Sequence, residues 1–300
     1  MWQLLTLTAL FFGSTEQIID KIVVVGYKTM DTLVASFYRN FVYFVIAVVL
    51  GLTGVFGKVQ IFFSWPILLL ALLSIGNAIF YTYLLKNIEL TGSAAIGYAT
   101  PFLFLLIDVF VVKSPINALQ ITGVILLIAG GLIFSISPET FRIKKEYTKY
   151  IWGIFLFEMV CSGIEYYTFK HYNSAIGLNE VSYLISTWLL VSVGFVILIA
   201  LFNKWRKLRP VATHDHFLAK ETASKFFDFI NSLLWLRALT LTAVSKVNAL
   251  ASFEPLMLLI LLYIVHRAFK LKTGEKFDRR SAYQKIFATS LLILGAFLAS

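Results

Sequence analysis

Apolar runs about twenty residues long, separated by short polar segments, fill the chain from end to end. A helix that crosses a bilayer needs roughly 20 predominantly apolar residues. By this measure we predict ten membrane-spanning helices, at 2–23, 31–52, 64–85, 91–112, 117–136, 150–170, 180–202, 222–241, 245–266 and 284–299. The segments KSPIN and LTLTAVS predict tight hairpins after the fourth and the eighth helix.

The composition supports this pattern. Apolar residues make up 59% of the 300 residues and charged residues 14%, whereas a typical soluble domain is roughly 25% charged. We therefore expect an all-α, multi-pass protein of the cell membrane, embedded in the lipid bilayer. The single cysteine, Cys161, excludes an intramolecular disulfide and a cysteine-cluster metal site.

The net charge of +10 comes largely from loops such as FRIKKEYTK and NKWRKLR. Basic loops beside membrane helices set orientation and contact anionic lipid head groups, so we expect no nucleic-acid partner. Most of the basic residues follow odd-numbered crossings as counted from the N-terminus, so they lie on the face opposite that terminus. The positive-inside rule then predicts a cytoplasmic basic face, with both termini outside.

Polar positions recur in corresponding helices of the two halves. Asn77–Pro101 and Asn231–Pro255 are each 24 residues apart, Glu16–Lys21 and Glu165–Lys170 five, and Gln120–Gly131 and Gln284–Gly295 eleven. These matches predict a duplicated five-helix unit at 1–136 and 150–300, joined by a polar linker at 137–149. Because five crossings return the chain on the other side, the second copy must be inverted. Inverted repeats are typical of secondary transporters, whose substrate site lies near the midplane between the repeats.

The segments that carry these matches resemble a known family. FYTYLLKNIELTGSAAIGYATPFLFLLIDVFVVKSPINALQITGVILLIAGGLIF and its counterpart LLWLRALTLTAVSKVNALASFEPLMLLI…SAYQKIFATSLLILGAFL resemble the third to fifth helices of the drug/metabolite transporter superfamily (EamA-type permeases). The resemblance implies transport of small metabolites, and termini inside rather than outside. The chain departs from the family in having no glutamate before the closing-helix glutamine in KSPINALQ; Asp278 stands near that place in the second half.

Ionisable residues within membrane helices are costly, roughly +2.5 to +3.5 kcal/mol at the bilayer centre by the mildest scale, and usually face a cavity or a partner. Nearly all the polar groups lie on the first, third, fourth, sixth, eighth and ninth helices, and the resemblance implies that the same six line the cavity. Helical spacing places Glu16 with Asp20, Glu158 with Glu165, and Asp228 with Asn231 and Trp235 on shared faces. The predicted substrate site comprises Glu16, Gln17, Asp20, Asn77, Tyr81, Glu158, Glu165, Asn231, Trp235 and Glu254, with helix kinks at Pro101 and Pro255.

Structural roles remain open for several of these residues. Asn77 and Asn231 can serve as hydrogen bonds between helices, and the prolines as kinks alone. Arg39 can reach the head groups or pair with an internal acid. Glu16 can form a static ion pair with Lys21 or Arg39.

Seven deep acids (Glu16, Asp20, Asp108, Glu158, Glu165, Asp228 and Glu254) stand against Lys21, Arg39 and Arg237. An acidic, aromatic cavity suits an amine, an amino acid or, as an alternative, the organic cations of multidrug efflux. Protons are the candidate coupling ion, because the Glu16–Glu165 repeat pair is expected to face this cavity.

Other functions fit less well. The chain has no GxxxxGK[ST] motif, so we expect no ATP site. A membrane-embedded enzyme would need clustered acids or histidines, whereas here the acids are dispersed; a passive pore or scaffold is the third alternative. His214-Asp215-His216 lies in a polar loop with no third ligand in view, so we expect no metal and no cofactor.

Overall fold

The computed structural model describes residues 1–26, 30–54, 59–87, 109–110, 113, 117–135, 145–212, 217–251, 253–269 and 279–299. This part of the chain contains helices and no strand. The helices are α1 (Trp2–Gly26), α2 (Thr32–Thr53), α3 (Trp65–Asn87), α6 (Ala118–Ser135), α7 (Lys145–Ile176), α8 (Glu180–Leu201), α9 (Trp205–Ala212), α10 (Phe217–Leu241), α11 (Val244–Ala251), α12 (Glu254–Phe269) and α13 (Arg279–Ala299).

The all-helical class is confirmed, and nine of the predicted crossings overlap helices. The fourth, 91–112, lies almost entirely outside the described residues. The ninth is divided, because α11 ends at Ala251 and α12 begins at Glu254. Helix α7 begins at Lys145, so the last residues of the predicted linker are helical.

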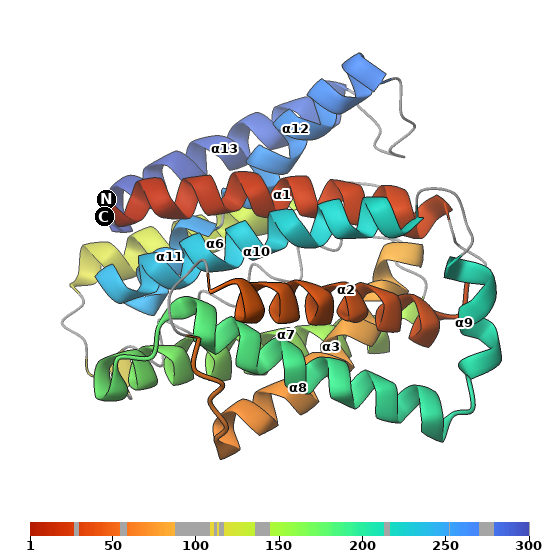
Figure 1. Ribbon diagram of the computed structural model, residues 1–300. Helices are drawn as coiled ribbons and strands as arrows, with labels where there is room; N and C mark the ends of the chain where they lie inside the picture. The colour runs from red at the N-terminus through yellow and green to blue at the C-terminus, as the bar shows by residue number, and fades with distance from the viewer. Residues whose placement is uncertain are drawn as a thin grey trace.

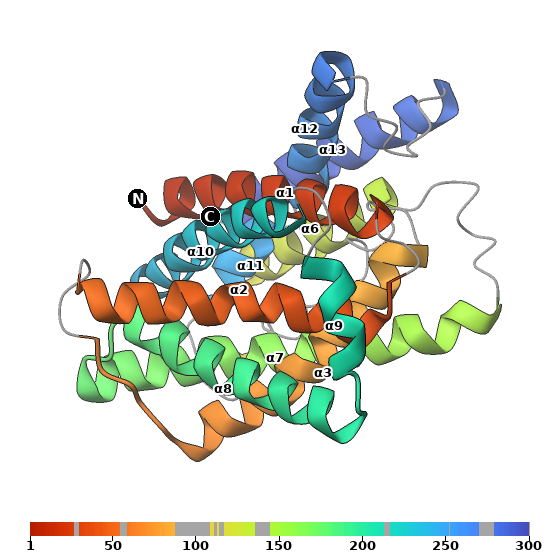
Figure 2. The same ribbon diagram turned by 45° about the vertical axis from the view of Figure 1, so that its right-hand side comes forward.

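The long helices form a bundle in which sequence-distant segments lie side by side (Figures 1 and 2). Helix α1 packs along α10, α2 along α8, α3 along α7 and α8, and α6 along α13. In both views the N- and C-termini lie at the same end of the bundle. The short helix α9 lies near the opposite end in Figure 1.

Local chemistry sets two of the helix starts. Asp31 precedes α2 and accepts a hydrogen bond from the Leu33 amide at 3.0 Å, and Asn179 precedes α8 and accepts one from the Ser182 amide at 2.7 Å. Each side chain satisfies a backbone N–H that has no partner within its helix. Helix α2 ends at Thr53 and is followed by Gly54, whose left-handed conformation (φ 59°) favours glycine.

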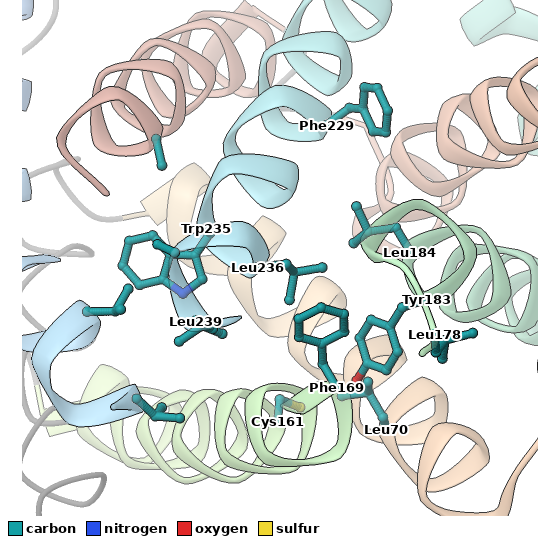
Figure 3. Packing of buried hydrophobic residues seen from close by; sticks show 14 of the residues in the cluster. Leu70, Cys161, Phe169, Leu178, Tyr183, Leu184, Phe229, Trp235, Leu236 and Leu239 are labelled. Atoms are coloured by element: carbon teal, nitrogen blue, oxygen red, sulfur yellow. The ribbon is translucent and has the colours of Figure 1, made fainter. Parts of the chain in front are cut away.

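A large apolar cluster lies toward the end that carries the termini. It joins the N-terminal halves of α1 and α3 to the C-terminal halves of α7 and α10 and the start of α8. Figure 3 shows its centre, where Phe169, Tyr183 and Leu236 from three different helices meet. Tyr183 is fully buried and donates a hydrogen bond to the Glu165 carbonyl at 2.8 Å, which ties α8 to α7.

Three described helical segments are long and apolar enough to cross a membrane: Thr32–Thr53, Trp65–Tyr83 and Glu180–Leu201. A 22-residue helix rises about 33 Å, which matches the roughly 30 Å hydrocarbon core of a bilayer.

Candidate functional site

A cavity of about 430 Å³ occupies the middle of the bundle. Helices α1, α2, α3, α7, α8, α10 and α12 all contribute to it. Its walls are formed by Leu10, Gly13, Glu16, Gln17, Asn40, Tyr43, Ser74, Asn77, Tyr81, Glu165, Tyr166, Leu184, Thr187, Trp188, Val191, Asp228, Asn231, Ser232, Trp235, Leu236 and Glu254.

Most of the predicted site residues meet at this cavity. They are Glu16, Gln17, Asn77, Tyr81, Glu165, Asn231, Trp235 and Glu254. Asp20 does not line the wall but lies fully buried on α1, one turn beyond Glu16. Pro101 and the side chains of Glu158 and Pro255 lie outside the described residues, although the backbone places Pro255 in the first turn of α12.

The prediction of six lining helices needs a correction, because α2 and α8 also line the cavity. They contribute uncharged groups, including Asn40, Tyr43, Thr187 and Trp188. A search for charged residues within apolar helices therefore missed them. Among the described residues, α6 and α13 contribute nothing to the wall; they pack against each other instead.

The cavity is acidic and aromatic. Carboxylates on four helices line it, and so do five aromatic side chains. The acids are Glu16, Glu165, Asp228 and Glu254, and the aromatic residues are Tyr43, Tyr81, Tyr166, Trp188 and Trp235. No lysine, arginine or histidine is found among the described residues of this wall.

Hydrogen bonds between helices hold two of these acids in place. The Gln17 amide of α1 donates to the Glu254 carboxylate at the start of α12. The Tyr43 hydroxyl of α2 donates to the Asp228 carboxylate of α10, and the Tyr43 ring packs 4.6 Å from that of Trp188. Both acids are therefore oriented by neighbours from another helix, and both remain partly exposed to the cavity.

Helices α1 and α10 approach closely at the cavity wall, because α1 has a glycine there. A Cβ atom at Gly13 would lie 3.1 Å from Nδ2 of Asn231, closer than ordinary van der Waals contact. The glycine thus leaves room for the Asn231 amide between α1 and α10.

A buried ionic cluster adjoins the cavity on the side remote from the termini. Lys225 Nζ lies 2.6 Å from Glu16 Oε1 and 3.2 Å from Asp20 Oδ2. Asp20 also accepts hydrogen bonds from Arg39 and Ser224. A second chamber of about 170 Å³ lies here, with Arg39, Lys225 and Thr82 in its wall.

Arg39 pairs with internal acids, which decides between its two predicted roles. Its guanidinium binds Asp20, lies 3.7 Å from Glu16 Oε1 and 4.0 Å from Glu221 Oε2, and sits 5.1 Å from the centre of the Tyr81 ring. Of the two partners predicted for Glu16, Arg39 is therefore within ion-pair distance. The Glu16 carboxylate makes its short contact with Lys225, a partner that we did not predict.

Sequence reasoning missed Lys225 and Glu221. The predicted eighth crossing began at residue 222 and so left out Glu221, whereas α10 begins at Phe217. Lys225 lay inside the predicted crossing but was not included among its deep ionisable residues. Extending the helix backward places Glu221 and Lys225 four residues apart on one face, with Asp228 three residues further. The segment FLAKETASKFFDFIN has this spacing, but its many polar residues did not indicate that one face of the helix is buried.

Arg237 was predicted as a deep base and is instead exposed. Its side chain is 59% exposed and pairs with Glu180 at 3.3 Å, at the start of α8. Arg237 is two positions, or about 200°, around the helix from Trp235, which faces the cavity. Arg237 therefore contributes no positive charge to the cavity wall.

Two lysines make matching contacts at opposite ends of the bundle. Lys21 Nζ, near the end of α1, donates to the Leu85 carbonyl near the end of α3 at 2.7 Å. Lys170 Nζ, in the last part of α7, donates to the Thr242 carbonyl just past the end of α10 at 2.9 Å. Cations at helix C-termini bind otherwise unpaired carbonyls and interact favourably with the helix dipole.

Comparisons with known proteins identify a fold and no family. No family model and no curated protein matches the sequence. A solved structure described as "Crystal structure of protein" is similar along its whole length, with a TM-score of 0.73 over 100% of this chain and 96% of the other, at 15% identity. At that identity the likeness shows the fold alone.

Proposed function

We propose that this protein is a multi-pass secondary transporter that moves small organic cations, chiefly amines, across the cell membrane by alternating access. The observation that carries the proposal is the central cavity, whose described wall combines four carboxylates with five aromatic rings and contains no basic side chain. Carboxylates attract a cation and aromatic faces bind it through their quadrupoles.

The placement of polarity supports a membrane location. Charged side chains are buried inside the bundle, as in Asp20 (0% exposed) and Lys225 (1%). Large apolar side chains face outward instead; Phe44 of α2 is 36% exposed and Ile197 of α8 is 52% exposed. In water this arrangement would be unfavourable, because it buries charge and exposes apolar surface. In lipid it is the expected arrangement.

The helix contacts support an inverted repeat. If α1, α2, α3 and α6 correspond to α7, α8, α10 and α13, the packing of α1 on α10 corresponds to that of α7 on α3. The pairs α2–α8 and α6–α13 correspond to themselves. The Lys21 and Lys170 contacts correspond as well. This exchange of partners is what a two-fold axis between the halves requires, and alternating access in such folds is motion of one repeat against the other.

The same arguments favour membership in the drug/metabolite transporter superfamily, which the motifs resemble. Within its range of substrates, the electrostatics selects the cationic class. An anionic substrate would meet four carboxylates and no basic side chain among the described residues of the wall. An organic phosphate would need arginines in the wall. The cavity volume falls within the usual range for small-molecule sites, about 300–1,000 Å³.

Three compounds with one phenylethyl body test the substrate class. Phenethylamine is a cation at neutral pH, phenylalanine a zwitterion and hydrocinnamate an anion. We expect phenethylamine to raise the unfolding temperature of the purified protein and to drive counterflow of its labelled form in proteoliposomes, with weaker effects of phenylalanine and none of hydrocinnamate. Preference for hydrocinnamate, or no counterflow of any amine in a wider screen, would refute the proposal.

Acid-to-amide variants locate the site. Glu165→Gln and Asp228→Asn remove charge from the cavity wall with little change in shape, so both should weaken phenethylamine binding. Glu180→Gln is the matched control, because Glu180 pairs with the exposed Arg237 and does not line the cavity. Equal binding by all three variants would place the amine elsewhere.

A further inference from the structure

The ionic cluster beside the cavity does not balance its charges. Five ionisable residues, each at most 8% exposed, lie within one network: Glu16, Asp20, Arg39, Glu221 and Lys225. Three of them are acids and two are bases. If all were ionised the cluster would carry one net negative charge away from water. Buried charges persist only when they are paired, so one further positive charge is required.

The contacts of the acids differ sharply. Asp20 binds Arg39, Lys225 and Ser224. Glu16 has a short contact with Lys225 and a longer one with Arg39. Glu221 Oε2 is buried with no hydrogen-bond partner among the described residues, and its nearest cation is Nε of Arg39, 4.0 Å away. Glu221 is therefore the least compensated acid of the three.

We propose that Glu221 is a proton-binding site: in this conformation its carboxyl group is neutral, and the bound proton supplies the missing charge. A carboxylic acid needs no cationic partner, whereas a buried carboxylate does. The two remaining acids then balance the two bases. Proton binding at Glu221 is thus what allows the network to be buried in this conformation.

Few charged groups near Glu221 could compensate a negative charge on its carboxyl group. Helix α1 presents Asp20 and Glu16, helix α2 presents Arg39, and Lys225 lies one turn along α10 itself. On the α9 side, Lys204 and Lys207 bind Asp31 instead. Both cations of the cluster make their short contacts with Glu16 and Asp20, so neither compensates Glu221 at hydrogen-bond distance.

A second step, which rests on the proposed function, links this proton to the cation. Glu16 belongs both to the cluster and to the wall of the main cavity. A substrate cation beside Glu16 supplies the same positive charge as the proton on Glu221. Binding of one cation then permits loss of one proton from Glu221 to water, leaving a carboxylate and conserving charge. This is an exchange of a proton for an organic cation.

Infrared spectroscopy of the purified protein tests the proton assignment without any substrate. A protonated carboxylic acid has a carbonyl stretch that is separate from the carboxylate bands and shifts in heavy water. We expect this band in the wild type at neutral pH, its loss in Glu221→Gln, and its retention in Glu180→Gln. Because the wild type alone shows whether a neutral buried acid exists, the test does not depend on a variant that folds. Absence of the band from the wild type, or its retention in Glu221→Gln, would overturn the assignment.

Proton release tests the second step. Benzyltrimethylammonium is the probe, because its charge does not change with pH. In a weakly buffered solution with a pH indicator, we expect one proton released per probe bound by the wild type and none by Glu221→Gln. Binding without release would refute the exchange, while the infrared result would still decide the proton assignment. Failure of the probe and of all other amines to bind would refute the proposed substrate class instead.

Discussion

Lys225 Nζ on α10 lies 2.6 Å from Glu16 Oε1 on α1, and both side chains are almost completely buried. The contact joins a helix near the start of the chain to one in its second half, at the boundary between the cavity and the ionic cluster. An uncompensated charge at this place is strongly unfavourable, because burial withdraws it from bulk water. The two partners are not equivalent, however, because Lys225 also serves Asp20.

Because Lys225 pairs with two acids, we expect its substitution to lower the free energy of unfolding more than substitution of Glu16 does. Lys225→Met leaves two acids short of a cation, and we expect it to lower the free energy of unfolding by about 3–5 kcal/mol. Glu16→Gln leaves Lys225 paired with Asp20 and should cost less. The double variant should be more stable than the sum of the single effects indicates, because the residues share one interaction. Denaturant unfolding in detergent measures all three, and strictly additive effects would contradict the pairing.

The close approach of α1 and α10 gives a steric prediction. In Gly13→Ala the new Cβ would crowd the Asn231 amide, so we expect a loss of about 1–3 kcal/mol in stability and weaker amine binding. Gly51→Ala on α2 is the control, since a Cβ there meets nothing within 4 Å. It should gain about 0.5–1 kcal/mol from the lower flexibility of alanine. Thermal unfolding with and without phenethylamine compares the two, and equal behaviour would show that the helices separate easily.

Several cavity residues could be predicted because lipid cannot solvate polar side chains. A polar side chain within an apolar helix must face the interior, so helical period alone identified Asn77 with Tyr81 and Asn231 with Trp235. All four line the cavity. The same period, applied to Arg237, would have placed it on the opposite face of α10 from Trp235. The prediction of Arg237 as a deep base was wrong because it considered the position of Arg237 along the helix and not the face on which it lies.

The ionic cluster was beyond local sequence reasoning. Glu221 and Lys225 lie in the polar segment FLAKETASK, in which Glu221 precedes the predicted crossing and Lys225 falls near its start, where a lysine is ordinarily expected to reach the head groups. Their burial depends on Asp20 and Arg39, about two hundred residues away in sequence, which compensate their charges. Only the packing of α1 and α2 against α10 brings these groups together. For the same reason the contributions of Tyr43 and Trp188, on helices without deep acids, were not expected.

Asp31, which directly precedes the apolar helix Thr32–Thr53, gives a prediction about pH. Partial burial raises its pKa, but hydrogen bonds from Lys204 and Lys207, the charge of Lys204 and the Leu33 amide lower it further, so the pKa lies below its ordinary value. A depressed folded-state pKa contributes stability above the unfolded-state pKa, and this contribution is lost as the pH falls through the folded value. We therefore expect Asp31→Asn to reduce the loss of stability on acidification.

Asparagine also separates the charge of Asp31 from its role at the start of α2. Asn caps a helix about as effectively as Asp does, so Asp31→Asn removes only the charge. Asp31→Ala removes both the charge and the cap, and loss of the cap costs about 1 kcal/mol at neutral pH. The order of neutral-pH stability should be wild type, then Asp31→Asn, then Asp31→Ala. Thermal unfolding across the acidic range measures both effects. An unchanged acid profile in Asp31→Asn would show that the lysine contacts are not made in solution.

The basic end of the bundle predicts how the protein sits in the membrane. Helix α9, with Arg206 and Lys207 in its first turn, lies remote from the two termini (Figure 1). By the positive-inside rule this end is cytoplasmic and the termini are outside, opposite to what the family resemblance implies. Replacing the buried Cys161 by serine provides a background for single cysteines at Ser300→Cys and Arg206→Cys. An impermeant maleimide should label Ser300→Cys in intact cells and Arg206→Cys only after permeabilisation. The reverse labelling would show that the charge asymmetry does not set the orientation and would favour the family arrangement.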